Sequence, residues 1–220
     1  KKIKNFMKNL IIQILPPFLF QILNNIRRRI LFTENVLFDG NDNLYKKHIK
    51  KCKIYGEYGV GKTTNWVLKN TNCKIICVDS SSQWINIVKG KIRLDSNVKR
   101  VKFKWYDLGE IGEWGNPVSY NKHQNIPKYI DSIWTENTKP DLVLVDGRFR
   151  IACFLKSLLK SEKNTKIIFD DYTNRRIYHI VEQVIKPTEI YKRQALFIKT
   201  EDLDIKLIKN LYSKFEYVMS

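Results

Sequence analysis

The chain has 220 residues and a mass of 26.2 kDa, which suits one α/β domain with a well-buried core and excludes two full domains. Lys and Arg number 40 against 22 Asp and Glu, so the formal net charge is +18 and a polyanion, an anionic membrane or an acidic ligand is a reasonable neighbour. The four cysteines are too few for a disulfide framework and lack the further ligands of a zinc site, which favours free thiols.

Residues 1–34 form a basic and apolar segment that differs from the rest of the chain. The apolar run "NLIIQILPPFLFQIL" is too short to cross a bilayer and is interrupted by Pro16 and Pro17. We expect a helical appendage that packs on the domain or lies on a membrane surface, with "RRR" at 27–29 near lipid phosphates. The chain starts at Lys1 without Met, so we expect it to be part of a longer protein.

From Cys52 onward, strand-like and helix-like segments alternate, which predicts a mostly parallel sheet with crossover helices. The predicted strands cover 52–57, 74–79, 101–107, 141–147 and 166–171, followed by a pair at 195–199 and 215–219. The predicted helices cover 62–70, 81–89, 150–160 and 174–186. Residues 108–128 follow neither period and contain several Gly and Pro, so we expect a long excursion from the sheet.

The stretch "GEYGVGKTT", Gly56–Thr64, has the spacing of a phosphate-binding loop. An apolar strand that ends at Asp146 resembles the second, magnesium-holding motif of nucleotide hydrolases. A phosphate-loop NTPase or kinase is therefore one alternative.

An acidic residue, however, lies at or just past the end of each of the first five predicted strands: Glu57, Asp79, Asp107, Asp146, and the pair Asp170 and Asp171. Ligands of open α/β sheets bind at these carboxyl ends, where such acids would repel a triphosphate. Asp79 follows Gly61 by 18 positions, the spacing of an acid that accepts ribose hydroxyls, and Asp107 could receive the amine of an adenine. The pattern favours adenosine without phosphates.

Five blocks carry a resemblance to a known family: "YGEYGVGKTT", "ICVDSSSQW", "WYDLGEIGEWGNP", "DLVLVDGRFRIACFL" and "IIFDDYTNRRIYHIVEQV". Together they resemble class I S-adenosylmethionine-dependent methyltransferases, and more narrowly the methyltransferase domains associated with polysaccharide and glycan biosynthesis. The resemblance covers residues 35–220 and implies a Rossmann-like fold, with a mostly parallel seven-stranded sheet and helices on both faces. It implies cofactor contacts by Glu57, Gly59, Gly61, Thr63, Asp79 and Asp107. Lys62 departs from the family pattern and creates the likeness to a phosphate loop.

Methyl transfer requires a positioned acceptor oxygen and removal of its proton. Asp146, Asp170 and Asp171 end two strands that face one crevice, which leaves two mechanisms open. In the first mechanism, the three aspartates hold a divalent cation (Mg or Mn), as in the catechol-type methyltransferases that this region loosely resembles. In the second, one carboxylate works with His179 as the base. The catalytic candidates are thus Asp146, Asp171 and His179; the candidates for substrate binding are Arg148, Arg150, Tyr172 and Arg176; and Trp105, Trp114 and Tyr120 are candidates for stacking on a sugar or the adenine.

The predicted function is S-adenosylmethionine-dependent O-methylation of a sugar hydroxyl of a glycan, in the cytoplasm or at a membrane surface. The resemblance implies fusion to, or association with, glycosyltransferases. A nucleic-acid-directed methyltransferase is the second alternative, suggested by the charge alone, since the basic residues are dispersed and no RNP, helix-turn-helix or zinc motif occurs. Nucleic acid is therefore not the expected partner.

Overall fold

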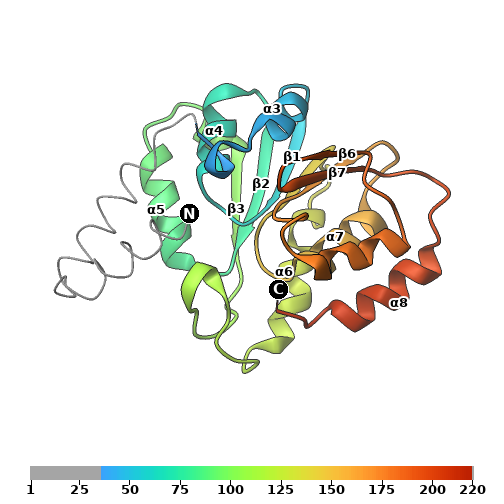
Figure 1. Ribbon diagram of the computed structural model, residues 1–220. Coiled ribbons are helices and arrows are strands. Elements are labelled where there is room, and N and C mark those ends of the chain that lie inside the picture. Colours follow the sequence, from blue (N-terminus) through green and yellow to red (C-terminus); the bar gives the residue numbers. More distant parts are fainter. Residues whose placement is uncertain (1–35, 220) are drawn as a thin grey trace, which may run out of the picture. The chain divides into compact units, whose positions relative to one another are not determined.

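A seven-stranded sheet forms the centre of the fold, in a computed structural model that describes residues 36–219 (Figure 1). The expectation for residues 1–34 lies outside this range. The strands are β1 (Ile54–Tyr58), β2 (Lys74–Asp79), β3 (Val101–Trp105), β4 (Leu142–Val145), β5 (Lys166–Phe169), β6 (Glu189–Tyr191) and β7 (Gln194–Ile198). Their order is β3-β2-β1-β4-β5-β7-β6, and β7 runs antiparallel to both of its neighbours. The predicted Rossmann-like, mostly parallel seven-stranded sheet is confirmed.

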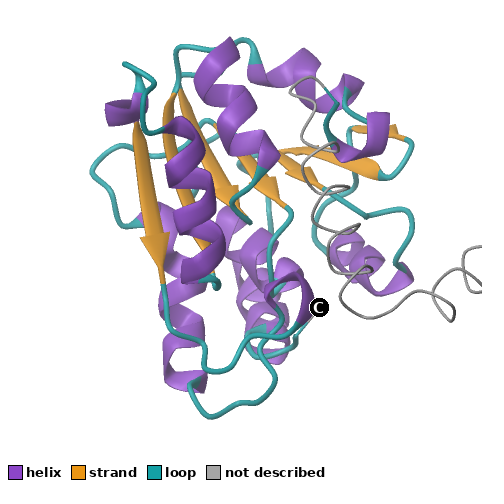
Figure 2. Cartoon of the chain, turned by 90° about the vertical axis from the view of Figure 1, so that its left-hand side faces the viewer, coloured by secondary structure: helices purple, strands orange, loops and turns teal. Residues whose placement is uncertain are grey.

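Helices cover both faces of the sheet (Figure 1, Figure 2). One face packs against α3 (Asn43–Ile49), α4 (Lys62–Asn70) and α5 (Ser82–Ile92), and the other against α6 (Ile126–Asp131), α7 (Arg150–Lys160) and α8 (Ile205–Phe215). Short 3-10 helices cover Phe38–Gly40, Val98–Arg100, Glu113–Gly115, His123–Asn125, Ser132–Trp134 and Arg176–Gln183. This arrangement explains why the central strands are mostly apolar, since neither of their faces meets water; the buried Glu57 in β1 is an exception.

Successive residues of β4 show how each strand serves both layers. Val143 and Val145 belong to the core on the α7 side, whereas Leu142 and Leu144 belong to the core on the α4 side. Side chains of a strand alternate between the two faces, so a strand buried on both sides, such as β4, is apolar at successive positions.

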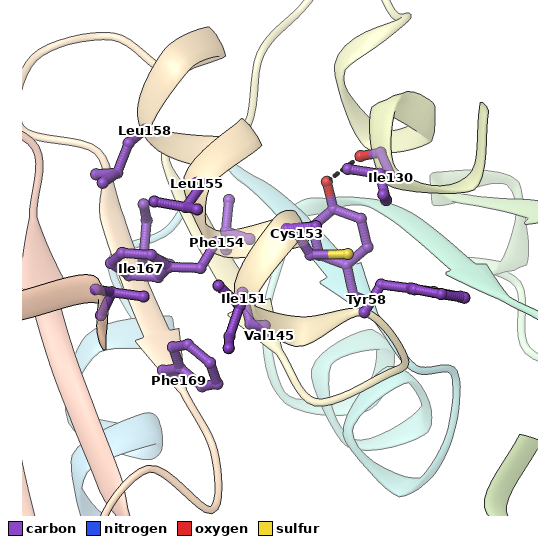
Figure 3. Packing of buried hydrophobic residues seen from close by; sticks show 14 of the residues in the cluster. Tyr58, Ile130, Val145, Ile151, Cys153, Phe154, Leu155, Leu158, Ile167 and Phe169 are labelled. Carbon is purple, nitrogen blue, oxygen red and sulfur yellow. Dashed lines mark hydrogen bonds between the residues drawn. The ribbon is translucent and has the colours of Figure 1, made fainter. Parts of the chain in front are cut away.

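The larger core lies between the sheet and α7 (Figure 3). The ring centroid of Phe154 lies 5.4 Å from that of Phe169 and 4.7 Å from that of Phe197, so one helix residue packs against two neighbouring strands. The Tyr58 hydroxyl, also buried, donates a hydrogen bond of 2.5 Å to the Ile130 carbonyl. This bond satisfies the polar tip of a large buried side chain.

The prediction of a strand at 215–219 is wrong. Helix α8 continues to Phe215, and the remaining strand is β6, which forms a hairpin with β7. The Asp204 side chain accepts the Leu207 amide at 2.9 Å, and Ile208, Leu211, Tyr212 and Phe215 follow at helical spacing. An N-cap followed by a 3.6-residue period outweighed the β-type composition of "FEYVM".

Two further expectations change in detail. Residues 108–122 are irregular apart from the 3-10 turn at Glu113–Gly115, and at His123 a further 3-10 turn leads into α6 at Ile126. The helix predicted at 174–186 is a 3-10 helix over Arg176–Gln183. Its buried residues, Tyr178 and Val181, are three positions apart, which matches the three residues per turn of a 3-10 helix. Within residues 36–219, every helix falls short of the length and apolar content that a bilayer crossing needs.

The tight packing around β1 predicts opposite effects for the same substitution at two glycines. A Cβ at Gly56 would lie 2.8 Å from Pro140 Cγ and 2.9 Å from Ile133 Cδ1, whereas a Cβ at Gly90, inside α5, would meet nothing within 4 Å. Gly56→Ala should lower the free energy of unfolding by about 1–3 kcal/mol through overpacking. Gly90→Ala should raise it by about 0.5–1 kcal/mol, because alanine favours helix. Urea unfolding measures both, and a stabilised Gly56→Ala variant would contradict the packing described here.

Candidate active site

The turns that leave β1 and β4 touch each other at two glycines. Gly59 has φ 97°, and a Cβ on it would lie 2.9 Å from the Gly147 amide nitrogen. A Cβ on Gly147 would lie 2.6 Å from the Tyr129 hydroxyl and 2.8 Å from the Gly59 nitrogen. The two turns therefore approach each other closely at the carboxyl ends of the two central strands, and neither position has room for a side chain.

Glu57 lies beneath this turn, fully buried. Its carboxylate accepts hydrogen bonds from the Thr63 hydroxyl and, at 2.6 Å, from the Thr64 hydroxyl, both in the first turn of α4. Burial raises the pKa of Glu57 to about 7, although the two threonine hydroxyls oppose the shift. The predicted cofactor residues Glu57 and Thr63 therefore bind each other and support the turn from below, and direct contact with a cofactor stays a prediction for both.

Asp79, at the end of β2, ties the glycine turn to the neighbouring strand. One carboxylate oxygen accepts the Val60 amide at 2.9 Å, and the other accepts the Ser81 amide at 2.8 Å. Burial raises the pKa of Asp79 to about 6, against the effect of these amides. Each oxygen retains a lone pair that a ligand hydroxyl can use.

Two tryptophans lie beside Asp79. Trp105 donates its indole N–H to the Ser80 carbonyl at 3.1 Å, and its side chain is half exposed. The Ser80 hydroxyl donates to the Gly115 carbonyl at 2.7 Å, which brings Trp114, 88% exposed and with φ 58°, close to the same strand end. An exposed aromatic ring held in a left-handed conformation is typical of a functional position.

The other residues predicted around the excursion lie in different places. Asp107 is half exposed, accepts the Gly109 amide at 2.9 Å and lies 3.6 Å from the Lys122 ammonium. Its carboxylate is therefore open to a ligand. Tyr120 donates its hydroxyl to the Tyr217 carbonyl at 2.9 Å, which directs this ring toward the C-terminal residues.

The structure brings Asp146, Asp170 and Asp171 together at the ends of β4 and β5. One carboxylate oxygen of each lies within 4.8 Å of the others. Asp146 is the most accessible, with 30% of its side chain exposed, against 18% for Asp171 and none for Asp170. Burial and the neighbouring Asp170 raise the pKa of Asp146, and Arg150 opposes this shift.

Guanidinium groups already neutralise these acids. Arg150 contacts Asp146 at 3.1 Å and Asp171 at 3.2 Å. Arg193 binds both oxygens of Asp170, at 3.1 and 2.7 Å, and the Gln194 amide adds a bond of 2.9 Å. Arg193 lies in the turn between β6 and β7, and nothing in the sequence near it indicates this pairing.

Two guanidinium groups share the three carboxylates that a divalent cation would use. Arg150 donates a hydrogen bond to Asp171 and forms an ion pair with Asp146, and Arg193 donates to Asp170. Mg²⁺ needs oxygen ligands in near-octahedral geometry, so a cation here would compete with Arg150 and Arg193 for the same carboxylates. As it stands, the cluster is an ion-pair network.

The remaining predicted residues divide by exposure. Tyr172 is buried and donates its hydroxyl to Glu182 at 2.7 Å, and the exposed His179 stacks on it with ring centroids 4.7 Å apart. Nε2 of His179 lies 3.2 Å from the Tyr172 carbonyl, and within residues 36–219 no hydrogen bond joins His179 to the aspartate cluster. Arg150 is 4% exposed, whereas Arg176 is exposed and Arg148 is half-buried. Arg148 and Arg176 thus remain accessible to a substrate.

The strand order, the reversed β7, the glycine turn after β1 and the acid after β2 together define a Rossmann-like methyltransferase fold. The sequence matches no known protein family, and no curated protein is significantly similar to it.

Among solved structures, a methyltransferase-like protein from Silicibacter pomeroyi superposes with a TM-score of 0.72 at 26% identity, over 82% of this chain and 95% of that chain. A candidate caffeoyl-CoA O-methyltransferase from Staphylococcus aureus superposes with a TM-score of 0.54 at 11% identity, over 91% of this chain and 100% of that chain. A methyltransferase from Geobacter sulfurreducens gives 0.53 at 11% identity, over 91% of this chain and 97% of that chain. The last two likenesses concern the fold alone.

The buried Glu57 predicts a pH-dependent stability. Its pKa of about 7 in the folded state exceeds the ordinary glutamate pKa of 4.5, so the folded chain binds the additional proton between these pH values and stability falls as the pH rises through them. The shift corresponds to about 3 kcal/mol. Glu57→Gln has no carboxyl proton at this position to lose, so its stability should not show this fall. Between pH 4.5 and 8, the free energy of unfolding of the variant should therefore rise by about 3 kcal/mol relative to that of wild type.

Urea unfolding at several pH values measures the effect. Glu201→Gln is the matched control, because the Glu201 side chain is 71% exposed. Its curve should run parallel to that of wild type. Parallel curves for Glu57→Gln as well would contradict the burial described for Glu57.

Proposed function

We propose that the chain is an S-adenosylmethionine-dependent O-methyltransferase that methylates a sugar hydroxyl of a glycan. The observation that carries this proposal is the set of residues at the carboxyl ends of β1, β2 and β4, where Gly59 and Gly147 bring two turns into close contact and each carboxylate oxygen of Asp79 accepts one backbone amide and keeps a further lone pair. This combination suits a nucleoside with free hydroxyls.

The residues present fit an adenosine-containing cofactor. Asp79 would accept the ribose hydroxyls, Asp107 would accept the adenine amine, and the Gly59 and Gly61 turn would lie against the rest of the molecule. Exposed Trp114 offers a face for stacking beside Asp79. When bound, S-adenosylmethionine supplies an electrophilic methyl group.

Asp146 is the carboxylate best suited to receive the acceptor's proton. It is the most exposed member of the cluster, its carboxylate is oriented by Arg150 at 3.1 Å, and its raised pKa makes it a stronger base than an ordinary aspartate. Asp171 acts through the same guanidinium and positions it. His179 remains a predicted base whose exposed ring is anchored by the Tyr172 carbonyl.

The sugar acceptor is supported by the sequence blocks that resemble glycan-associated methyltransferase domains and by the exposed Trp105 and Trp114, which suit a sugar face. Glycosyltransferase partners and contact of residues 1–34 with a membrane surface belong to the same proposal.

A phosphate-loop NTPase is the second candidate, because Lys62 begins α4 directly after the glycine turn. Calorimetry with S-adenosylmethionine and with ATP plus magnesium separates the two. We expect binding of S-adenosylmethionine, its loss in Asp79→Ala because the ribose hydroxyls lose their acceptor, and little change in Lys62→Ala. Tight ATP binding that depends on Lys62, without binding of S-adenosylmethionine, would overturn the proposal.

The ion-pair network predicts that methyl transfer does not require a divalent cation. Since Arg150 and Arg193 occupy the carboxylates, a chelator should change the rate of transfer to oligosaccharides by less than about twofold, and the chain should not bind Mn²⁺ tightly in a direct titration. A rate that falls with chelator and returns with Mg²⁺ or Mn²⁺ would show instead that a cation displaces a guanidinium.

A further inference from the structure

Arg148 lies between β4 and α7, directly after the glycine that touches the turn of β1. Its amide donates to the Tyr129 hydroxyl at 3.2 Å, and its carbonyl accepts the Cys153 thiol at 3.4 Å. Both partners are buried. These two hydrogen bonds hold the backbone of Arg148, and with it the Cα from which the side chain extends, in place.

The guanidinium of Arg148 differs from those of Arg150, Arg175 and Arg193, and it is more buried than that of Arg176. Arg150, Arg175 and Arg193 each contact a carboxylate of the aspartate cluster. Within residues 36–219, the Arg148 guanidinium makes no ion pair, and its Nε is fully buried without a hydrogen-bond partner. A buried, unpaired donor on a charged group is costly, and a water, an ion or a ligand that accepts its hydrogen bond removes that cost.

Several charged groups act on Arg148 or feel its charge. The charge of Arg148 favours the ionised form of Asp79, and Arg150 and Arg175 disfavour the charged form of Arg148. Burial and these two like charges lower the pKa of Arg148 from its usual value. An anion at this point would relieve the repulsion.

The start of α7 adds to the preference for an anion. No side chain caps the helix, its first turn contains no acid, and its N-cap residue, Phe149, is buried. The first amides of an uncapped helix carry partial positive charge. Arg148 precedes this terminus directly, so both features favour negative charge at the same place.

We propose that Arg148 binds an anionic oxygen group of the acceptor, a carboxylate or a phosphate, so that the methylated sugar is an acidic one. The planar fork of a guanidinium matches both groups in bidentate geometry. The inference rests on the proposed function, and it deepens that proposal from sugars in general to acidic sugars. The carboxylate of the cofactor is the competing occupant.

Calorimetry on the full chain saturated with S-adenosylhomocysteine tests the proposal with three probes: glucuronate, glucose 6-phosphate and uncharged glucose. Wild type should bind at least one of the two anionic probes more tightly than glucose, and the tighter one identifies the group. Arg148→Gln should weaken this binding roughly 10- to 100-fold, and Arg148→Lys, which keeps the charge without the fork, should weaken it less. Arg93→Gln, at the exposed end of α5, is the matched control and should bind as wild type does.

Equal affinity of Arg148→Gln and wild type for both anionic probes would overturn the inference. So would a loss of S-adenosylhomocysteine affinity in Arg148→Gln at an unchanged melting temperature, which would assign the arginine to the cofactor's carboxylate. If wild type binds no S-adenosylhomocysteine, the proposed function fails, and the same anion titrations without it still decide the role of Arg148.

Discussion

The contact between Gly59 and Gly147 is the constraint on which the rest of the site depends. β1 and β4 are neighbours in the centre of the sheet. The turns that follow them contact each other, with no side chain between them. A Cβ at either position would meet backbone atoms at 3.0 Å or less, so the two turns can approach only as glycines. Asp79 then fixes the first turn through the Val60 amide, and Tyr129 fixes the second through the Arg148 amide. The close approach of the two turns therefore positions both the strand ends where we propose that the cofactor binds and those where we propose that the acceptor binds.

Charge balance decides what the carboxyl ends can bind. Three aspartates at neighbouring strand ends would destabilise the fold if all were ionised and unpaired, because buried charges lose their hydration. Arg150 and Arg193 compensate them within the protein, and Asp170, with no exposed side-chain area, holds a bidentate pair with Arg193. The same network competes with any cation for the carboxylates of the cluster. Asp146 is the member most exposed to solvent. Arg148 forms no ion pair within residues 36–219, and its Nε has no hydrogen-bond partner, which is why we propose it as the anion-binding residue.

The sequence predicted the features that depend on local pattern. The spans 62–70, 74–79 and 150–160 match α4, β2 and α7, since each combines a clear period with a nearby turn signal. It also predicted that Asp146, Asp170 and Asp171 would cluster, because parallel strands bring their carboxyl ends to one edge. It did not predict β6, whose three residues acquire strand geometry only by pairing with β7. Nor did it predict Arg193, whose contact with Asp170 spans 23 positions and depends on the β6–β7 turn. Such contacts arise from tertiary placement and leave no local period.

The likeness of Gly56–Thr64 to a phosphate loop can be understood in the same terms. A strand, a glycine turn and a helix start bring backbone amides close to any nucleotide, so the geometry alone does not select phosphate. In this chain Glu57 lies directly beneath that helix start, bound to Thr63 and Thr64. As its pKa is about 7, it carries a substantial negative charge at neutral pH, which offsets the charge of Lys62 and the partial positive charge of the helix terminus. A loop that binds a triphosphate needs those positive charges uncompensated, whereas an uncharged ribose and adenine do not. We therefore expect the buried Glu57, bound to the first turn of α4, to disfavour a triphosphate at this turn.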